Sequence, residues 1–165
     1  MDGAVFTRNT PNFILYSASG EDQTTSVDEL LSNGKPLIVQ IYAEWWQPCI
    51  PAALELQRLS EFYGKSATFA LVNISGPKSC QKFAETHQLK DIRHFYQGNF
   101  PDIFEFRYIP HTIVFRGDGT VIKNNDFSGT NLEETISSLI PLEEEKEKQI
   151  NAQDTDPNSD VSDIQ

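Results

Sequence analysis

Cysteine is the residue type in this chain that is best suited to covalent chemistry, and the sequence has two, Cys49 and Cys80. Two cysteines are too few to build a disulfide framework, and neither they nor the three histidines have metal-ligand spacing. We therefore expect no zinc site, no other metal and no cofactor. The usual state of a free cysteine is that of a small, buried apolar side chain.

Each cysteine lies near the predicted start of a helix. Cys49 follows the sequence Trp-Trp-Gln-Pro at 45–48, and Cys80 follows Gly-Pro-Lys-Ser at 76–79. A helix N-terminus lowers the pKa of a nearby thiol, because free N–H groups and the helix macrodipole stabilise the thiolate. Lys78 would add to this effect at Cys80. The sequence thus offers two candidate reactive thiols.

The elements that position these thiols alternate between strand and helix. Continuous apolar runs at 36–42 and 67–74 predict strands buried on both faces, each followed by a helix, at 50–63 and 79–89. This order indicates parallel pairing through right-handed crossovers, in an α/β sandwich with a mixed sheet. The first helix has a predicted core stripe of Ile50, Leu54, Leu56, Leu59, Phe62 and Tyr63. The other predicted elements are a strand at 13–16, a capped single turn at 26–31, a short segment at 92–95, a helix near 100–106, a strand at 111–115, a hairpin turn at 117–119 and a last helix at 132–140.

The charge of the chain is strongly acidic, with 13 basic and 24 acidic residues and a net charge of −11. Such a charge opposes binding to phosphate backbones and anionic lipid, so we expect no nucleic-acid partner. No run approaches the roughly 18 apolar residues of a membrane span, and the first 30 residues lack the apolar core of a signal peptide. We expect no membrane span and an intracellular, cytoplasmic location, with an organelle left open.

The C-terminal end is the most acidic part of the chain. Residues 143–165 hold eight acidic and two basic side chains, a proline and no aromatic residue. Such a segment buries too little apolar area to offset the entropy lost on ordering, so we predict a largely disordered, solubilising tail. The alternative for this tail is a docking segment for a basic partner. The predicted organisation is an N-terminal arm at 1–10, one domain at 11–142 and the tail at 143–165.

Two stretches resemble the thioredoxin-like superfamily. Residues 34–49 (GKPLIVQIYAEWWQPC) resemble its active-site strand and turn, and residues 109–115 (IPHTIVF) with Gly-Asp-Gly at 117–119 resemble its cis-proline loop, strand and hairpin. The extra stretch between Cys80 and Tyr108 points to the redoxin branch, which includes TlpA-like reductases, tryparedoxins and nucleoredoxins. The resemblance implies a three-layer α/β/α sandwich with a mixed central sheet and a redoxin-type insertion. It also implies a cis Ile109–Pro110 bond.

The chain departs from the family at the positions that do its chemistry. In thioredoxins the first cysteine of Cys-x-x-Cys is the nucleophile and the second resolves the mixed disulfide. By that resemblance Trp46 replaces the nucleophile and Cys49 holds the resolving position, so the dithiol cycle cannot run. Gln40 stands where many relatives have a buried acid, and an amide is no general base.

The resemblance also places an apolar surface beside the turn, which we call the lip: Trp45, Trp46, Pro48, Ile109 and Pro110. We expect His111 to present a hydrogen-bond donor there. An exposed indole beside an open backbone edge suits protein binding, so the predicted function is a redox-inactive binding or structural module, alone or in a larger complex. The oligomeric state stays open.

Three alternatives remain at the sequence level. Cys49 alone could act as a monothiol oxidoreductase that forms mixed disulfides with glutathione or a client protein. Trp46 could instead fold back over the turn and fill the lost substrate groove. A Cys49–Cys80 redox pair requires the two thiols to meet, although the two helices usually pack on opposite faces in this fold.

Overall fold

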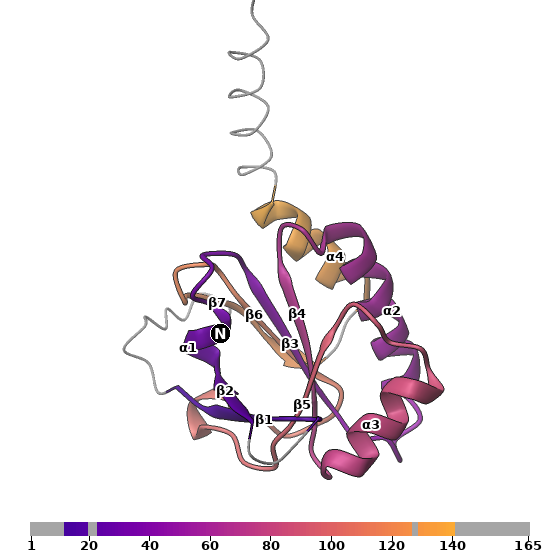
Figure 1. The fold of residues 1–165 in the computed structure, drawn as a ribbon. Helices are drawn as coiled ribbons and strands as arrows, with labels where there is room; N and C mark the ends of the chain where they lie inside the picture. The colour runs from indigo at the N-terminus through magenta and orange to yellow at the C-terminus, as the bar shows by residue number, and fades with distance from the viewer. Residues whose placement is uncertain (1–11, 20–22, 127–128, 141–165) are drawn as a thin grey trace, which may run out of the picture.

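The computed structural model describes residues 12–19, 23–126 and 129–140 (Figure 1). The predicted arm at 1–10 and the predicted acidic tail at 143–165 lie outside these residues. The strands are β1 (Ile14–Ser17), β2 (Thr24–Ser26), β3 (Leu37–Tyr42), β4 (Thr68–Asn73), β5 (Arg93–Tyr96), β6 (His111–Phe115) and β7 (Val121–Asp126). The helices are α1 (Val27–Leu30), α2 (Cys49–Tyr63), α3 (Pro77–Thr86), α4 (Gly129–Leu139) and a 3-10 turn, η1 (Asp102–Phe104). Within the described ranges, none of the helices has the length and apolar character needed to cross a lipid bilayer.

A single mixed sheet carries the fold, in the order β2-β1-β5-β4-β3-β6-β7. The central strands β3 and β4 are parallel, with Val39 opposite Ala70, and β6 pairs antiparallel with β3. Every residue of β3 is buried, which is the outcome predicted from its continuous apolar run. The mixed α/β fold expected from the sequence is confirmed.

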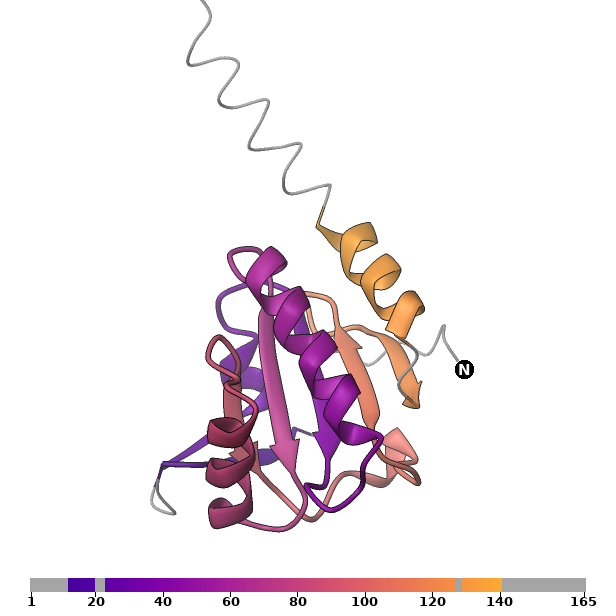
Figure 2. The ribbon, with the colours of Figure 1, turned by 90° about the vertical axis from the view of Figure 1, so that its right-hand side faces the viewer.

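The two faces of the sheet are covered unequally. Helices α2, α3 and α4 all lie on one face (Figure 2), where they enclose a core that includes Ile38, Cys49 and Phe83. The other face is covered by the single turn α1 and by the segment 97–110, whose Phe104 belongs to a second core. The expectation that α2 and α3 pack on opposite faces is wrong, because the crossovers into both helices run on the same side of β3 and β4.

The single turn α1 forms as its sequence predicts. The Ser26 hydroxyl accepts a hydrogen bond from the backbone N–H of Glu29 at 3.2 Å, which satisfies one of the free donors of the first turn. This cap fixes Val27 and Leu30 against the second core.

The predicted core stripe of α2 is correct in part. Leu56 and Leu59 are buried, but Leu54 is 45% and Phe62 73% exposed. The buried face of this helix instead uses the small residues Ala52 and Ala53, which let it approach the sheet closely. The helix is therefore apolar over more than the face it buries.

The segment 100–106 is a loop with one 3-10 turn and not the predicted helix. Phe100 and Phe104 pack on Phe13, whose ring lies 5.6 Å from that of Phe100 and 5.7 Å from that of Phe104, whereas Tyr108 is exposed. Glu105 adopts a left-handed conformation (φ 50°) that ends the turn.

A pair of glycines closes the far end of the sheet, where β3 begins and β6 ends. A Cβ atom on Gly117 would lie 2.0 Å from the backbone oxygen of Gly34, so the two backbones touch. Gly34 itself has a φ of +77°, which glycine adopts without strain. This contact holds the β6–β7 turn against the start of β3.

Candidate functional site

The candidate site lies at the end of the sheet where β3 finishes and β6 starts. Ile41 pairs with His111, so the loop that follows β3 and the loop that precedes β6 leave the sheet side by side. These loops carry all the residues of the lip. Residues 45–48 and 109–110 therefore lie at the same end of the sheet, and their use as one binding surface stays a prediction.

The turn at 43–48 exposes its aromatic side chains. The Trp46 N–H donates to the Ala43 carbonyl at 3.3 Å, and the Cys49 N–H donates to the Trp46 carbonyl at 2.9 Å, so the turn leads directly into α2. Trp45 is 63% and Trp46 45% exposed. Both indoles therefore lie at the surface of the turn.

The second half of the lip is less exposed. Ile109 and Pro110 are both half-buried, and Ile109 packs against both cores. The peptide bond between them is cis, the form that the motif resemblance implies. Pro48, by contrast, is exposed at the start of α2.

Cys49 lies beneath the turn and is shielded from solvent. Its exposure is 0%, and its neighbours include Ala53 and Leu56 in the main core. Burial raises the pKa of the Cys49 thiol, with a smaller opposing effect from a backbone hydrogen bond at Ala43 that favours the thiolate. The thiol is therefore protonated at neutral pH, even though it occupies the first turn of a helix.

Cys80 is also a buried, free thiol. It donates a hydrogen bond to the Phe95 carbonyl at 3.4 Å. Burial raises the pKa of Cys80 to about 11, and the neighbouring Tyr42 hydroxyl opposes that rise only in part. The activation by Lys78 and the helix N-terminus that the sequence suggested is wrong, because desolvation outweighs it. The two cysteines form no disulfide.

His111 lies behind the lip and does not present a donor there, contrary to prediction. It is buried, and its Nε2 is 2.7 Å from Oδ1 of Asn124. Because the Asn124 amide nitrogen donates to the Phe104 carbonyl at 3.0 Å, its oxygen is the acceptor and His111 donates through Nε2. The Phe106 ring packs edge-on against the imidazole, with ring centroids 5.6 Å apart. His111 thus ties the loop before β6 to β7.

A polar cluster that sequence reasoning missed joins the loops after β3 and β4. The buried Asn73 amide donates to the Glu44 carboxylate at 3.1 Å, and its oxygen accepts from the backbone N–H groups of Ser75 and Gly76. Burial alone would raise the pKa of Glu44, but hydrogen bonds from its own backbone, Asn73, Ser75 and Ser79 together hold that pKa below its usual range. The sequence feature that could have predicted this cluster is Asn73, an asparagine at the end of a predicted buried strand.

Gln40 is fully buried on the sheet face that carries α2. Side chains alternate along a strand, so Gln40 points the same way as Ile38 and Tyr42, which belong to the core beneath that helix. In β6 its opposite residue is Thr112, also buried. An amide does not titrate, so this position supplies no proton acceptor near Cys49.

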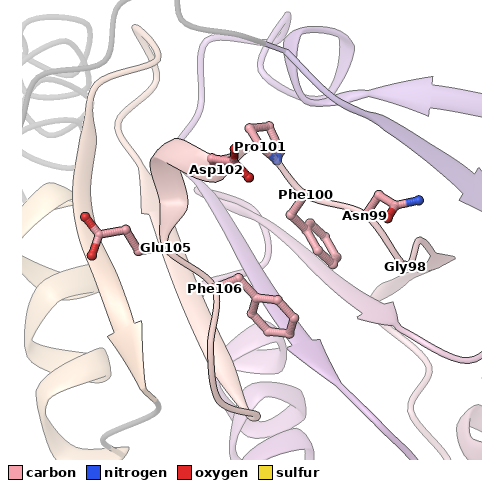
Figure 3. Close-up of a pocket in the computed structure, with 7 residues that line it drawn as sticks. All are labelled: Gly98, Asn99, Phe100, Pro101, Asp102, Glu105 and Phe106. Carbon is pink, nitrogen blue, oxygen red and sulfur yellow. The ribbon is translucent and has the colours of Figure 1, made fainter.

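A small hollow lies in the segment before the lip. It has a volume of about 280 Å³ and is lined by Gly98, Asn99, Phe100, Pro101, Asp102, Glu105 and Phe106. Figure 3 shows the rings of Phe100 and Phe106 on one side of the loop and Glu105 turned to the other. This volume is near the lower end of the ~300–1,000 Å³ range of small-molecule pockets. Among the described residues, no group of three or more His, Cys, Asp or Glu is placed to hold a metal ion.

The chain has sequence relatives among thioredoxin-like proteins. No family model matches the chain. In sequence it is 27% identical over 117 residues to a thiol:disulfide interchange protein TxlA homolog of Synechocystis, covering 68% of this chain and 54% of that protein. It is 31% identical over 83 residues to the chloroplastic thioredoxin-like protein HCF164 of Arabidopsis thaliana, covering 48% of this chain and 31% of that protein. The chain thus spans about a third to a half of the length of these relatives.

Solved structures agree with the sequence relatives. A secreted Mycobacterium tuberculosis disulfide oxidoreductase homologous to E. coli DsbE superposes with a TM-score of 0.64 at 20% identity, covering 77% of this chain and 96% of that one. The thioredoxin domain of a thiol-disulfide oxidoreductase from Bacteroides vulgatus superposes with a TM-score of 0.66 at 16% identity, covering 85% and 98%. The chain has the thioredoxin-like α/β fold.

Proposed function

We propose that this chain uses the thioredoxin-like fold, which it shares with a thiol:disulfide interchange protein homolog, as a redox-inactive module that binds a protein partner at the lip. The observation that supports this most is the pairing of an exposed Trp46 with a fully buried Cys49 three residues later. The surface that would carry a reactive thiol in the thioredoxin motif carries an indole instead.

The chemistry of disulfide exchange explains why this pairing matters. A thiolate attacks a substrate disulfide and forms a mixed disulfide, and a second thiol must then attack it to release the reduced substrate. Here the thiol at the turn is buried and its pKa is raised, so it is a poor first nucleophile. Cys80 offers no second thiol, because it is buried with a pKa of about 11 and directs its proton to Phe95.

The same burial weighs against the monothiol alternative. A thiol that forms mixed disulfides with glutathione must meet it at the surface, and Cys49 has no exposed area. The alternative draws support from the names of the sequence relatives, two of which are a thiol:disulfide interchange protein homolog and a thioredoxin-like protein. Accessibility of Cys49 therefore separates the two functions.

Insulin reduction tests the redox half of this proposal. We expect no turnover by the wild type with dithiothreitol or with a thioredoxin reductase as electron donor. Trp46→Cys restores the two-thiol spacing at the start of α2 and should restore measurable turnover. Trp45→Cys is the matched control, because it adds a thiol to the same turn at the wrong spacing. Wild-type turnover above the uncatalysed rate overturns the proposal, and so does a Trp46→Cys variant that stays inactive while Trp45→Cys gains activity.

Partner capture tests the binding half. Proteins recovered on the wild type should be lost or weakened on Trp46→Ala by at least about 30-fold in affinity, the effect of a ~2 kcal/mol hot spot. Ile14→Ala is the control, because Ile14 is comparably exposed on β1, away from the lip. Equal affinity of wild type and Trp46→Ala for every recovered partner would remove the lip from the proposal.

A further inference from the structure

The side chain of Glu44 links the turn that carries the lip indoles to a neighbouring loop. Glu44 directly precedes Trp45 and Trp46 in the chain, and it is half-buried whereas both indoles are exposed. The Asn73 amide donates a hydrogen bond to its carboxylate at 3.1 Å. Because Asn73 is the last residue of β4, this bond joins the turn after β3 to the loop after β4.

The residue at the other end of this bond is itself firmly held. Asn73 is fully buried, and its carbonyl accepts a hydrogen bond from the Gln97 N–H at 2.9 Å. Its side-chain oxygen accepts from the backbone N–H groups of Ser75 and Gly76 at 2.6 and 3.1 Å. Asn73 is therefore a fixed anchor, and Glu44 attaches the turn to it.

The rest of the turn is held more weakly. The Trp46 N–H reaches the Ala43 carbonyl at 3.3 Å, which is long for a backbone hydrogen bond, and Pro48 gives α2 no side-chain cap. Among the described residues, Glu44 is the side chain of positions 43–48 that has a hydrogen bond to another loop. The orientation of the turn thus depends on Glu44 more than on its other side chains.

The surroundings of Glu44 suit a carboxylate. The hydroxyls of Ser75 and Ser79 donate to it in addition to the Asn73 amide. Ser79 lies in the first turn of α3, where the helix macrodipole also favours a negative charge. Hydrogen bonds to an ionised acceptor are about twice as strong as those between neutral groups. The attachment of the turn is therefore a strong one.

A firm attachment matters for a surface that binds through exposed aromatic side chains. A partner that meets mobile side chains must order them, and this lost entropy reduces the affinity. A turn that is fixed at Glu44 presents both indoles in a narrow range of directions before the partner arrives. A purely structural role for Glu44 would instead lower stability and leave the motion of the indoles in the folded protein unchanged.

We infer that Glu44 is a positioning residue for the lip, whose carboxylate holds the turn so that Trp45 and Trp46 face a partner in a fixed orientation. This inference rests on the proposed function, because it assigns the two indoles to binding. It adds a residue that acts through the indoles and need not touch the partner.

Tryptophan emission tests this inference without a partner, because Trp45 and Trp46 are the only two tryptophans of the chain. Time-resolved anisotropy separates rotation of the whole protein from the faster motion of the indoles. Glu44→Ala should raise the amplitude of the fast motion at least about twofold. Glu44→Gln keeps an acceptor for Asn73 and should stay closer to the wild type.

Further variants make this measurement specific. Trp45→Phe and Trp46→Phe backgrounds assign the signal to one indole at a time. Glu44→Asp keeps the charge but draws the oxygens back from Asn73, so it should also raise the fast motion, and it replaces the alanine variant if that variant does not fold.

Glu55→Ala is the matched control. Glu55 is also half-buried and hydrogen-bonded, to Arg58 at 2.9 and 2.7 Å, but it lies on α2 beyond the turn. This variant should leave the fast motion of the indoles unchanged. All variants are compared well below their melting temperatures, with matching circular dichroism spectra. Unchanged indole motion in Glu44→Ala overturns the inference, and so does an equal rise in Glu55→Ala.

Affinity for a protein captured on the wild type separates this inference from the proposed function. Glu44→Ala should weaken that affinity at least about fivefold, and less than Trp46→Ala does, because it frees the indoles without removing one. Wild-type affinity in Glu44→Ala, with mobile indoles, overturns the positioning role and leaves binding at the lip standing. Wild-type affinity in Trp46→Ala overturns the proposed function and the role of Glu44 with it.

Discussion

The start of α2 and the start of α3 occupy equivalent positions in the fold, but the loops before them differ. Each helix follows a central parallel strand, β3 or β4, at the same end of the sheet, and each holds a fully buried cysteine in its first or second turn. At α3 the loop is fastened by Asn73, which hydrogen-bonds to Glu44 and to the backbone of the loop. Neither helix has a side-chain cap, but the turn before α2 exposes two indoles.

Catalytic thiol sites combine a position at a helix N-terminus with access to the protein surface, and neither cysteine of this chain has both. Both cysteines have raised thiol pKa values because both are buried, so placement at a helix N-terminus does not by itself make a thiol reactive. What differs is the surface above each thiol, which is polar and closed at α3 and apolar and open at α2. If this comparison holds, the start of α2 serves binding and the start of α3 stabilises the fold.

The largest expected effect is on thiol reactivity. In the native protein both Cys49 and Cys80 should react with a maleimide at least about a thousandfold more slowly than in guanidinium, because reaction requires local opening that costs several kcal/mol. Mass spectrometry of labelled peptides assigns the rate to each cysteine. Rapid labelling of Cys49 alone in the native protein would show that the two thiols differ in accessibility, and it would favour the monothiol function.

The next effect is on stability. Asn73→Ala removes three hydrogen bonds from a buried site and should lower the free energy of unfolding by about 3 kcal/mol. Trp46→Ala, at the exposed turn, should change it by less than about 0.5 kcal/mol. Urea denaturation followed by circular dichroism measures both. Comparable losses in the two variants would show that the indole is structural.

A smaller effect concerns acid stability. The folded pKa of Glu44 is below its unfolded value, so Glu44 binds fewer protons in the native state. Its contribution to stability is complete above the unfolded pKa of about 4.3 and is lost as pH falls through the folded pKa. Glu44→Gln keeps an acceptor for Asn73 but removes the charge, so its stability should fall less steeply below pH 4.3 than that of the wild type. Parallel curves in urea titrations from pH 7 to pH 2.5 would exclude this role.

The smallest effect is expected at Lys78. Because burial sets the pKa of Cys80, Lys78→Ala should leave the pH dependence of Cys80 alkylation unchanged, with a stability change within about 0.5 kcal/mol. Alkylation is measured between pH 7 and pH 10 under conditions that permit local opening. A rate profile shifted to higher pH in the variant would restore Lys78 as an activating charge.

The sequence predicts the sheet well, because the strands depend on local pattern. The runs at 36–42, 67–74 and 111–115 are buried strands, and Ser26 caps its turn, because continuous apolar residues and a capping hydroxyl have few other structural uses. The order of the strands also brings residues 45–48 and 109–110 to one end of the sheet, and their role as a binding surface stays a prediction.

The rest depends on contacts that are distant in sequence. Phe100 and Phe104 have helical spacing, yet they pack on Phe13, more than 80 residues away in the chain, and form no helix. His111 turns inward because Asn124 of β7 accepts its hydrogen bond. Leu54 and Phe62 looked like core residues, because periodicity identifies an apolar face but not which element, if any, covers it.

The contact between Gly117 and Gly34 predicts which positions of this chain can vary among its homologues. Glycine at 117 should persist among homologues because a methyl group there would strike the backbone of residue 34, whatever those homologues bind. The indoles at 45 and 46 have no such steric constraint, and under the proposed function they diverge where a lineage changes its partner. Invariance at 117 would report a steric limit, and variation at 46 would trace a change of partner.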